Sequence, residues 1–73
     1  MIEKTENRPH LSPRQKQTLQ LIWDGMTSEE IAHKLDISGR TVHGLVKDLM
    51  QISGTGNRVL LVRWAIQHEL VKV

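Results

Sequence analysis

The chain has 73 residues, which allows one domain with a small hydrophobic core and leaves little room for a catalytic cleft. It contains no cysteine, so a disulfide framework and a thiolate zinc site are both excluded. The formal net charge is only +2, but residues 38–73 hold five Lys or Arg residues and two acidic ones, and this local basic excess favours a polyanion as partner.

The N-terminal stretch MIEKTENRPH is polar, mixed in charge and lacks the apolar run of a signal peptide. Pro9 disfavours a helical conformation at Arg8, so we expect residues 1–10 to form a flexible tail or linker and residues 11–73 to form the domain. No stretch of the sequence approaches the roughly 20 apolar residues of a membrane-spanning helix. We therefore expect a cytoplasmic protein with no membrane partner.

The first helix has a well-defined start signal. Ser12 suits the N-cap, Pro13 suits the first helical position, and Gln15 completes a capping box. Gly25 can adopt a positive φ and ends the helix. We assign Thr18 to the same side as Gln15, so the predicted buried stripe is narrow. The apolar residues at helical spacing are Leu19, Ile22 and Trp23.

A helix-turn-helix is predicted directly after this helix. Thr27 opens a second capping box and a short helix over residues 28–35. Asp36 ends it, because Asp tolerates the left-handed conformation, and Ser38 caps a third helix over residues 39–51. In this motif the second helix can enter a major groove roughly 12 Å wide. An ordinary αα-hairpin inside a helical domain is the alternative.

The third helix separates into an apolar and a polar face. The residues assigned to the core are Val42, Leu45, Val46 and Leu49, and those left on the outer face are Arg40, His43, Gly44, Lys47, Asp48 and Gln51. Lys47 can donate to guanine O6 and N7, and Gln51 suits adenine or a phosphate. The helix start after Ser38 is suited to a phosphate. Gly44 indicates either a backbone that lies close to a partner or a tolerated surface glycine.

Asn57 caps a fourth helix after the break at residues 53–56. We expect this helix to carry apolar residues as far as Leu70 and Val73, on more than one side. Helical spacing assigns these residues to two different faces. One face carries Leu61, Trp64 or Ala65, and His68, and the other carries Val59, Val62, Ile66 and Val73. Self-association explains this surplus of apolar surface most simply, and a broad core face with one or two exposed aliphatic side chains is the alternative.

The sequence does not indicate an enzyme, a metal site or a cofactor. The four histidines, at positions 10, 33, 43 and 68, do not pair at helical spacing, and no thiol is available to join them. Glu29 and Glu30 are explained by their position at a helix start, where carboxylates interact favourably with the helix dipole.

With these elements in place, the chain resembles the LuxR/GerE-type DNA-binding domain of bacterial transcription regulators over residues 11–71, without an insertion. The matching residues are Leu11-Ser12-Pro13-Arg14-Gln15, Leu19, Gly25, Glu30-Ile31-Ala32, Leu35, Ile37-Ser38, Thr41-Val42, Val46, Leu49, Gly54, Asn57-Arg58, and Val62 to Ala65.

The resemblance implies an all-α, four-helix domain with residues 39–51 as recognition helix. The resemblance also implies that His43, Gly44 and Lys47 face base edges and that Thr41 and Arg58 contact the phosphate backbone. The fourth helix is commonly the dimer contact, and the corresponding residues here are Val59, Val62, Arg63 and Ile66. Family members usually act as dimers on inverted half-sites, often with an N-terminal receiver or ligand-sensing domain.

Several residues depart from the family pattern. Leu45 replaces a frequent His, Asp36 replaces a frequent Gly, and Ile52-Ser53 stands where a basic residue followed by Leu is usual. Gly39, His43 and Gly44 make the reading face less basic than is typical. The preferred DNA site therefore cannot be carried over from the family.

We thus expect a sequence-specific DNA-binding transcription regulator, or its DNA-binding domain, that acts as a homodimer on double-stranded DNA. RNA polymerase or another regulator is a further expected partner. The DNA-binding residues we expect are Ser38, Arg40, Thr41, His43, Gly44, Lys47, Gln51 and Arg58. The competing hypothesis is a protein-interaction module that uses the apolar fourth helix and binds DNA weakly or not at all.

Overall fold

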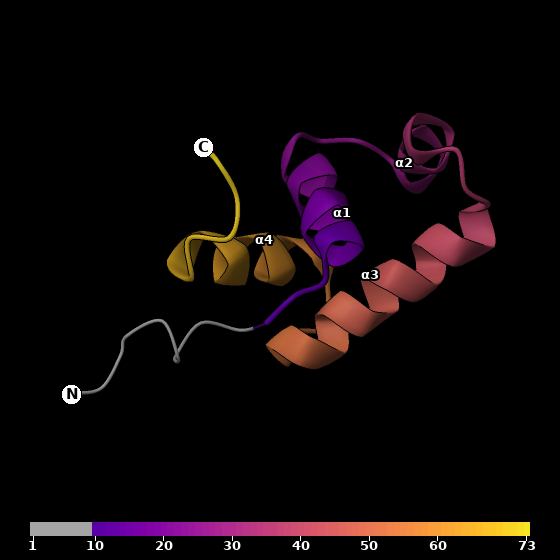
Figure 1. The fold of residues 1–73 in the computed structure, drawn as a ribbon. Helices are drawn as coiled ribbons and strands as arrows, with labels where there is room; N and C mark the ends of the chain where they lie inside the picture. The colour runs from indigo at the N-terminus through magenta and orange to yellow at the C-terminus, as the bar shows by residue number, and fades with distance from the viewer. Residues whose placement is uncertain (1–9) are drawn as a thin grey trace.

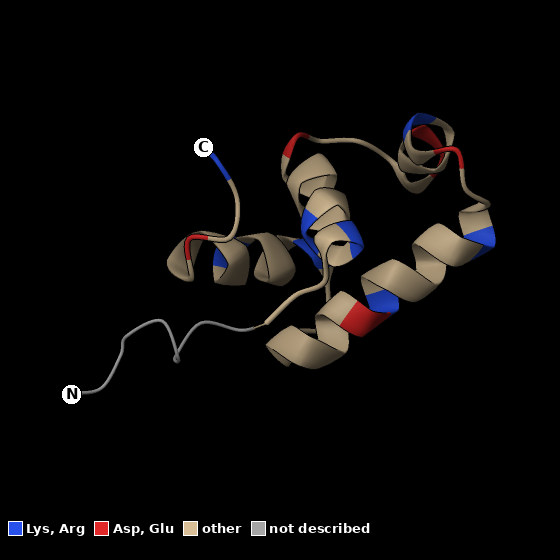
Figure 2. Ribbon diagram, in the orientation of Figure 1, with Lys and Arg blue, Asp and Glu red and all other residues tan. Residues whose placement is uncertain are grey.

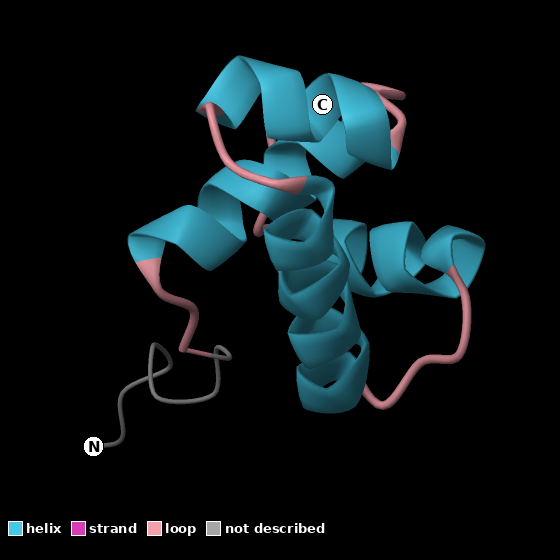
Figure 3. Cartoon of the chain, turned by 90° about the vertical axis from the view of Figure 1, so that its right-hand side faces the viewer, coloured by secondary structure: helices cyan, strands magenta, loops and turns pink. Residues whose placement is uncertain are grey.

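The computed structural model describes residues 10–73, and this part of the chain forms four α-helices and no strand (Figure 1) (Figure 3). The helices are α1 (Pro13–Trp23), α2 (Ser28–Leu35), α3 (Gly39–Ser53) and α4 (Arg58–Gln67). The predicted all-α, four-helix fold is confirmed. The predicted tail lies outside the described residues, apart from the exposed His10.

Both predicted capping boxes form. Ser12 Oγ accepts from the Gln15 N–H at 3.1 Å, and Gln15 Oε1 accepts from the Ser12 N–H at 2.8 Å. At the start of α2, Thr27 Oγ1 accepts from the Glu30 N–H at 3.2 Å, and Glu30 Oε1 accepts from the Thr27 N–H at 2.8 Å. Each pair of bonds satisfies N–H groups that have no partner within the helix, so the helix starts are fixed locally.

The turn between α2 and α3 takes the predicted conformation. Asp36 has φ 57° and ψ 47°, in the left-handed region. The Ile37 N–H then donates to the Ala32 carbonyl at 3.0 Å, which satisfies one of the last carbonyls of α2. This turn is short, so that α3 begins at Gly39 with only residues 36–38 between it and the end of α2.

α3 packs against each of the other three helices, and α1 also contacts α2 and α4 (Figure 1). The core takes apolar side chains from all four helices, with Leu11 added from the segment before α1. The fully buried apolar residues are Leu19, Ile31, Val42, Leu49, Leu61 and Ala65. Because one face of α3 supplies two of them, its opposite face is turned away from the core.

Two assignments to the core differ from the prediction. Thr18, which we assigned to a polar side of α1, is fully buried. Its Oγ1 donates to the Arg14 carbonyl at 2.9 Å, so the hydroxyl is satisfied within its own helix and the methyl group packs in the core. Leu45, which we assigned to the core, is only half-buried.

The ends of α3 and α4 were also predicted incorrectly. α3 continues to Ser53, two residues beyond the expected end, and Gly54 terminates it with φ 72°. α4 ends at Gln67 rather than continuing to Val73, because Glu69 takes φ 56° and turns the chain. The Leu70 N–H then donates to the Ala65 carbonyl at 2.9 Å.

The last residues run along α1 instead of extending α4. Gln20 holds them by its side-chain amide, which accepts from the Lys72 N–H at 2.8 Å and donates to the Lys72 carbonyl at 3.3 Å. Leu70 and Val71 pack against the core beside it. Within residues 10–73, no helix is long and apolar enough to cross a bilayer.

Candidate nucleic-acid interface

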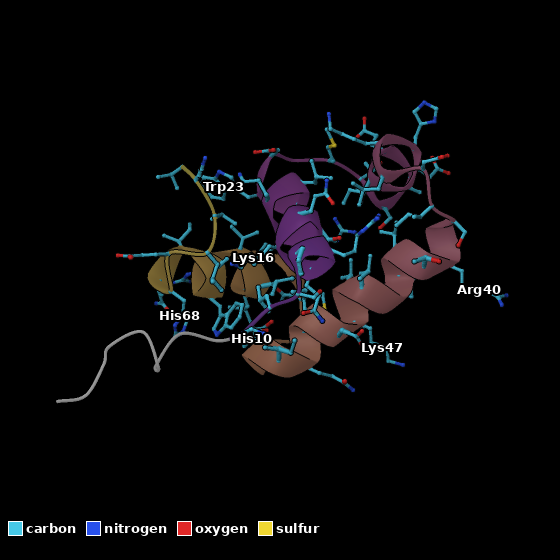
Figure 4. The ribbon with its side chains drawn as sticks, in the orientation of Figure 1. His10, Lys16, Trp23, Arg40, Lys47 and His68 are labelled. Atoms are coloured by element: carbon cyan, nitrogen blue, oxygen red, sulfur yellow. The ribbon has the colours of Figure 1, made fainter. Side chains whose placement is uncertain are left out.

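The outer face of α3 is open to solvent along its whole length. Its exposed residues are Arg40, Thr41, His43, Gly44, Lys47, Asp48 and Gln51. The labelled side chains of Arg40 and Lys47 both project away from the rest of the domain (Figure 4). On the inner face, Val42, Val46 and Leu49 are buried. The predicted reading face is therefore free of the hydrophobic core and can approach a flat or grooved partner.

The start of α3 lies on this exposed surface. Ser38 Oγ accepts from the Thr41 N–H at 3.0 Å and lies 2.9 Å from the Thr41 hydroxyl. The cap thus uses the Thr41 N–H, while the N–H groups of Gly39 and Arg40 belong to the first turn, where no helical partner exists. The positive end of the helix dipole and the Arg40 guanidinium meet here, an arrangement that favours an anion such as a phosphate.

Charge on α3 is basic at the start and mixed further along. The charged residues of α3 are Arg40 in its first turn, Lys47 two turns later and Asp48 directly after it. Figure 2 accordingly shows two blue segments and one red segment on this helix. Asp48 gives the face one site that repels phosphate, so the surface is less uniformly positive than a non-specific polyanion binder requires.

Gly44 is not required by the packing of the domain itself. A Cβ atom built at this position meets nothing within 4 Å. In the interior of a helix, glycine costs about 1 kcal/mol relative to alanine, and here no intramolecular contact compensates for this cost. This open space agrees with both interpretations from the sequence, a close approach to a partner and a tolerated surface glycine.

Arg58 lies beside the α3 face and is held by its own domain. It is half-buried, and its guanidinium donates to Ser28 Oγ at 2.6 Å and to the Met26 carbonyl at 3.4 Å. The sequence reasoning missed Ser28 as a partner, because a serine one residue after a capping threonine carries no signal of a contact 30 residues away. Together with α3 side chains, these groups line a hollow of about 440 Å³. The lining residues are Ser28, His43, Val46, Lys47, Met50 and Arg58.

A second exposed surface lies on α4. Val59 is 69% exposed and Ile66 is 41% exposed, whereas Leu61 and Ala65 are buried on the opposite side. This division agrees with the expected faces for these four residues, whereas Val62, expected on the face of Val59 and Ile66, is half-buried and packs against the core. The exposed face forms one wall of a groove of about 600 Å³, whose other wall is the end of α1 and the loop after it. Val59, Val62, Arg63 and Ile66, the residues expected at a dimer contact, all line this groove.

Comparison with known families gives one match over most of the chain. The sequence model of GerE, described as bacterial regulatory proteins of the luxR family, matches residues 9–65. This range includes α1, α2, α3 and most of α4.

Two curated relatives are themselves regulators by name. The probable transcriptional regulator ycf29 of Porphyra purpurea is 45% identical over 62 residues, which cover 85% of this chain and 30% of that protein. The response regulator Rre1 of Synechocystis sp. is 39% identical over 61 residues, covering 84% of this chain and 26% of that protein. The chain thus spans less than a third of the length of these relatives.

Solved structures agree with the fold. The transcription factor GerE superposes with a TM-score of 0.80 at 21% identity, covering 85% of this chain and 92% of that one. The response regulator ChrA of a heme-sensing two-component system superposes with a TM-score of 0.82 at 30% identity, covering 92% of this chain and 33% of that one. These matches do not favour the protein-interaction module as the principal function. The chain belongs to the luxR family of bacterial regulatory proteins and is a helix-turn-helix DNA-binding domain of that transcription-regulator family.

Proposed function

We propose that the domain inserts α3 into the major groove and reads base edges with His43, Gly44 and Lys47. The observation that carries this proposal is that the outer α3 face is exposed to solvent while Val42, Val46 and Leu49 of the inner face are buried. Arg40 and Lys47 are seven residues apart, which corresponds to roughly 10 Å along a helix axis. That length spans about three base pairs, an ordinary footprint for one recognition helix.

Phosphate contacts flank the reading face in this proposal. Ser38, Arg40 and Thr41 hold a phosphate at the exposed start of α3, and Gln51 contacts an adenine or a phosphate toward the other end. Arg58 lies at the edge of the same surface. Contacts of this kind set the register of the domain on the duplex, whereas the base contacts set the sequence preference.

We further propose that the domain acts as a homodimer through Val59, Val62, Arg63 and Ile66. The support is the exposed aliphatic strip of α4 and the groove next to it. A C2 dimer built on this strip would present two α3 helices to two inverted half-sites. We infer a cytoplasmic regulator without catalytic activity, and the expected contact to RNA polymerase or another regulator stays a prediction.

Selection of bound duplexes from a random pool by the 73-residue chain, at a stated salt concentration, tests the proposal. We expect enrichment of an inverted repeat. Enrichment of a single half-site supports reading by α3 and contradicts the dimer. A pool that stays random after repeated rounds contradicts sequence-specific binding.

A further inference from the structure

Arg58 connects two helices that do not pack against each other. It is the first residue of α4, and its guanidinium reaches Ser28, the first residue of α2, at 2.6 Å. Within residues 10–73, α2 contacts α1 and α3, and α4 contacts the same two helices, but α2 and α4 have no direct backbone contact. The Arg58 side chain therefore bridges this gap.

The bridge has the properties of a rigid link. The guanidinium is planar and offers several N–H donors in a fixed geometry, so bonds to two acceptors hold it more firmly than one bond would hold a lysine. Its acceptors are Ser28 Oγ and the Met26 carbonyl, which lie on either side of the Thr27 cap. Because Arg58 and Ser28 are both half-buried, solvent screens this contact less than it screens an exposed pair.

The bridge also borders the reading face. Arg58 and Ser28 line the same hollow as His43 and Lys47 of α3. Arg58 lines the groove on the α4 side as well, next to Val59 and Val62. One side chain thus separates the surface proposed to meet DNA from the surface proposed to meet the second protomer.

We propose that Arg58 is a positioning residue whose hydrogen bond to Ser28 fixes the orientation of the α2–α3 unit relative to α4 and so sets how α3 meets DNA. This assigns Ser28 a part in DNA recognition and gives Arg58 a different role from the direct phosphate contact implied by the family resemblance. The inference rests on the proposed function, because it concerns affinity for the duplex selected by the wild-type chain.

The test compares S28A, R58A, R58K and the double variant S28A/R58A on that selected duplex and on a scrambled duplex, over a range of salt. We expect S28A to weaken specific binding about three- to tenfold, which is the effect typical of residues that act through another group. The double variant should bind no more weakly than R58A, because the S28A change removes a bond that R58A has already removed. S28T keeps the hydroxyl and should restore the wild-type affinity.

The salt dependence separates positioning from phosphate contact. If Arg58 has a positioning role, R58A should keep the wild-type slope of log K against log[salt]. R58K should then bind the duplex as weakly as R58A, because lysine does not reproduce the planar fork of the guanidinium. A direct phosphate contact lowers the slope by about 0.9 in R58A, and R58K restores it. Circular dichroism shows whether each variant keeps its helices.

Three results would overturn the inference: wild-type affinity in S28A, additive losses in the double variant, or recovery by R58K with a reduced slope in R58A. Each of them leaves the proposed function intact if the wild-type chain binds the selected duplex. Failure of the wild-type chain to bind any duplex instead removes the proposed function, and the inference with it.

Discussion

Lys47 is the exposed cation in the middle of the outer α3 face, two helical turns beyond Arg40. If it donates to a base edge, K47A should weaken binding to the selected duplex by about 1–3 kcal/mol and relax the preference at one base position. Competition binding with single-base variants of the duplex measures both effects.

Lys72 provides a charge-matched control for this substitution. It is exposed near the C-terminus, where its backbone bonds to Gln20 of α1. K72A removes the same charge and should leave the sequence preference unchanged. Equal losses for K47A and K72A would mean that only the net charge of the domain matters.

Thr18 is a polar residue that behaves as part of the core. Its hydroxyl donates to the Arg14 carbonyl of the same helix, and that carbonyl stays paired within the helix when the hydroxyl is removed. T18V should therefore leave the free energy of unfolding unchanged or raise it slightly, whereas T18S removes a buried methyl group and should cost about 1 kcal/mol. Urea denaturation of both variants measures the difference, and a larger loss in T18V than in T18S would contradict this account.

Helix starts were predicted more accurately than helix ends. The capping residues Ser12, Thr27, Ser38 and Asn57 act within three residues of themselves, so their signal is local and the sequence alone locates it. The end of α4 depends on the left-handed turn at Glu69 and on the Gln20 amide, 52 residues away from Lys72. A contact of that kind leaves no periodic trace in the sequence.

The outer face of α3 was predicted from the sequence, whereas the contact between Arg58 and Ser28 beside it was not. Helical periodicity located Arg40, His43 and Lys47 on one exposed side, because a helix face follows from residue spacing alone. The bond from Arg58 to Ser28 joins two separate helices, and only the tertiary arrangement reveals it. The sequence therefore predicted the exposed side of α3 and singled out Arg58, but it did not predict Ser28 or the bond that joins the two residues.

Gly44 allows a test on α3 as an element. Because a Cβ atom meets nothing there, G44A should raise the free energy of unfolding by about 0.5–1 kcal/mol. If the backbone of α3 approaches the duplex closely at this point, the same variant should bind DNA more weakly. Thermal unfolding and DNA titration on one preparation measure both quantities.

Gly56 serves as the matched glycine for this test. It lies in the loop before α4, where a Cβ atom also meets nothing within 4 Å. G56A should leave DNA affinity unchanged. Wild-type DNA affinity in G44A would identify Gly44 as a tolerated surface glycine and contradict the close approach.

The proposed dimer of the whole molecule can be tested with two aliphatic residues of α4 that are similarly exposed but lie on different sides of the helix. Ile66 is 41% exposed and lines the groove proposed as the dimer contact, whereas Leu60 is 43% exposed and lines a different hollow. I66D should favour the monomer and weaken binding to an inverted repeat more than binding to a single half-site, because a buried carboxylate is costly in an apolar interface. L60D should leave the dimer in place.

Sedimentation equilibrium of both variants measures their oligomeric state. A dimer that persists in I66D, or one that L60D disrupts instead, would place the contact elsewhere on the domain. The pair isolates the side of α4 that carries the contact, since both changes add one negative charge to the same helix.

The central claim concerns the domain as a whole: it binds duplex DNA through several phosphate contacts around α3. The most direct measurement is the affinity of the wild-type chain for the selected duplex across a series of salt concentrations. Each phosphate neutralised by a Lys or Arg contributes about −0.9 to the slope of log K against log[salt], so we expect a steep linear decrease. An affinity that stays constant over the series would contradict the account.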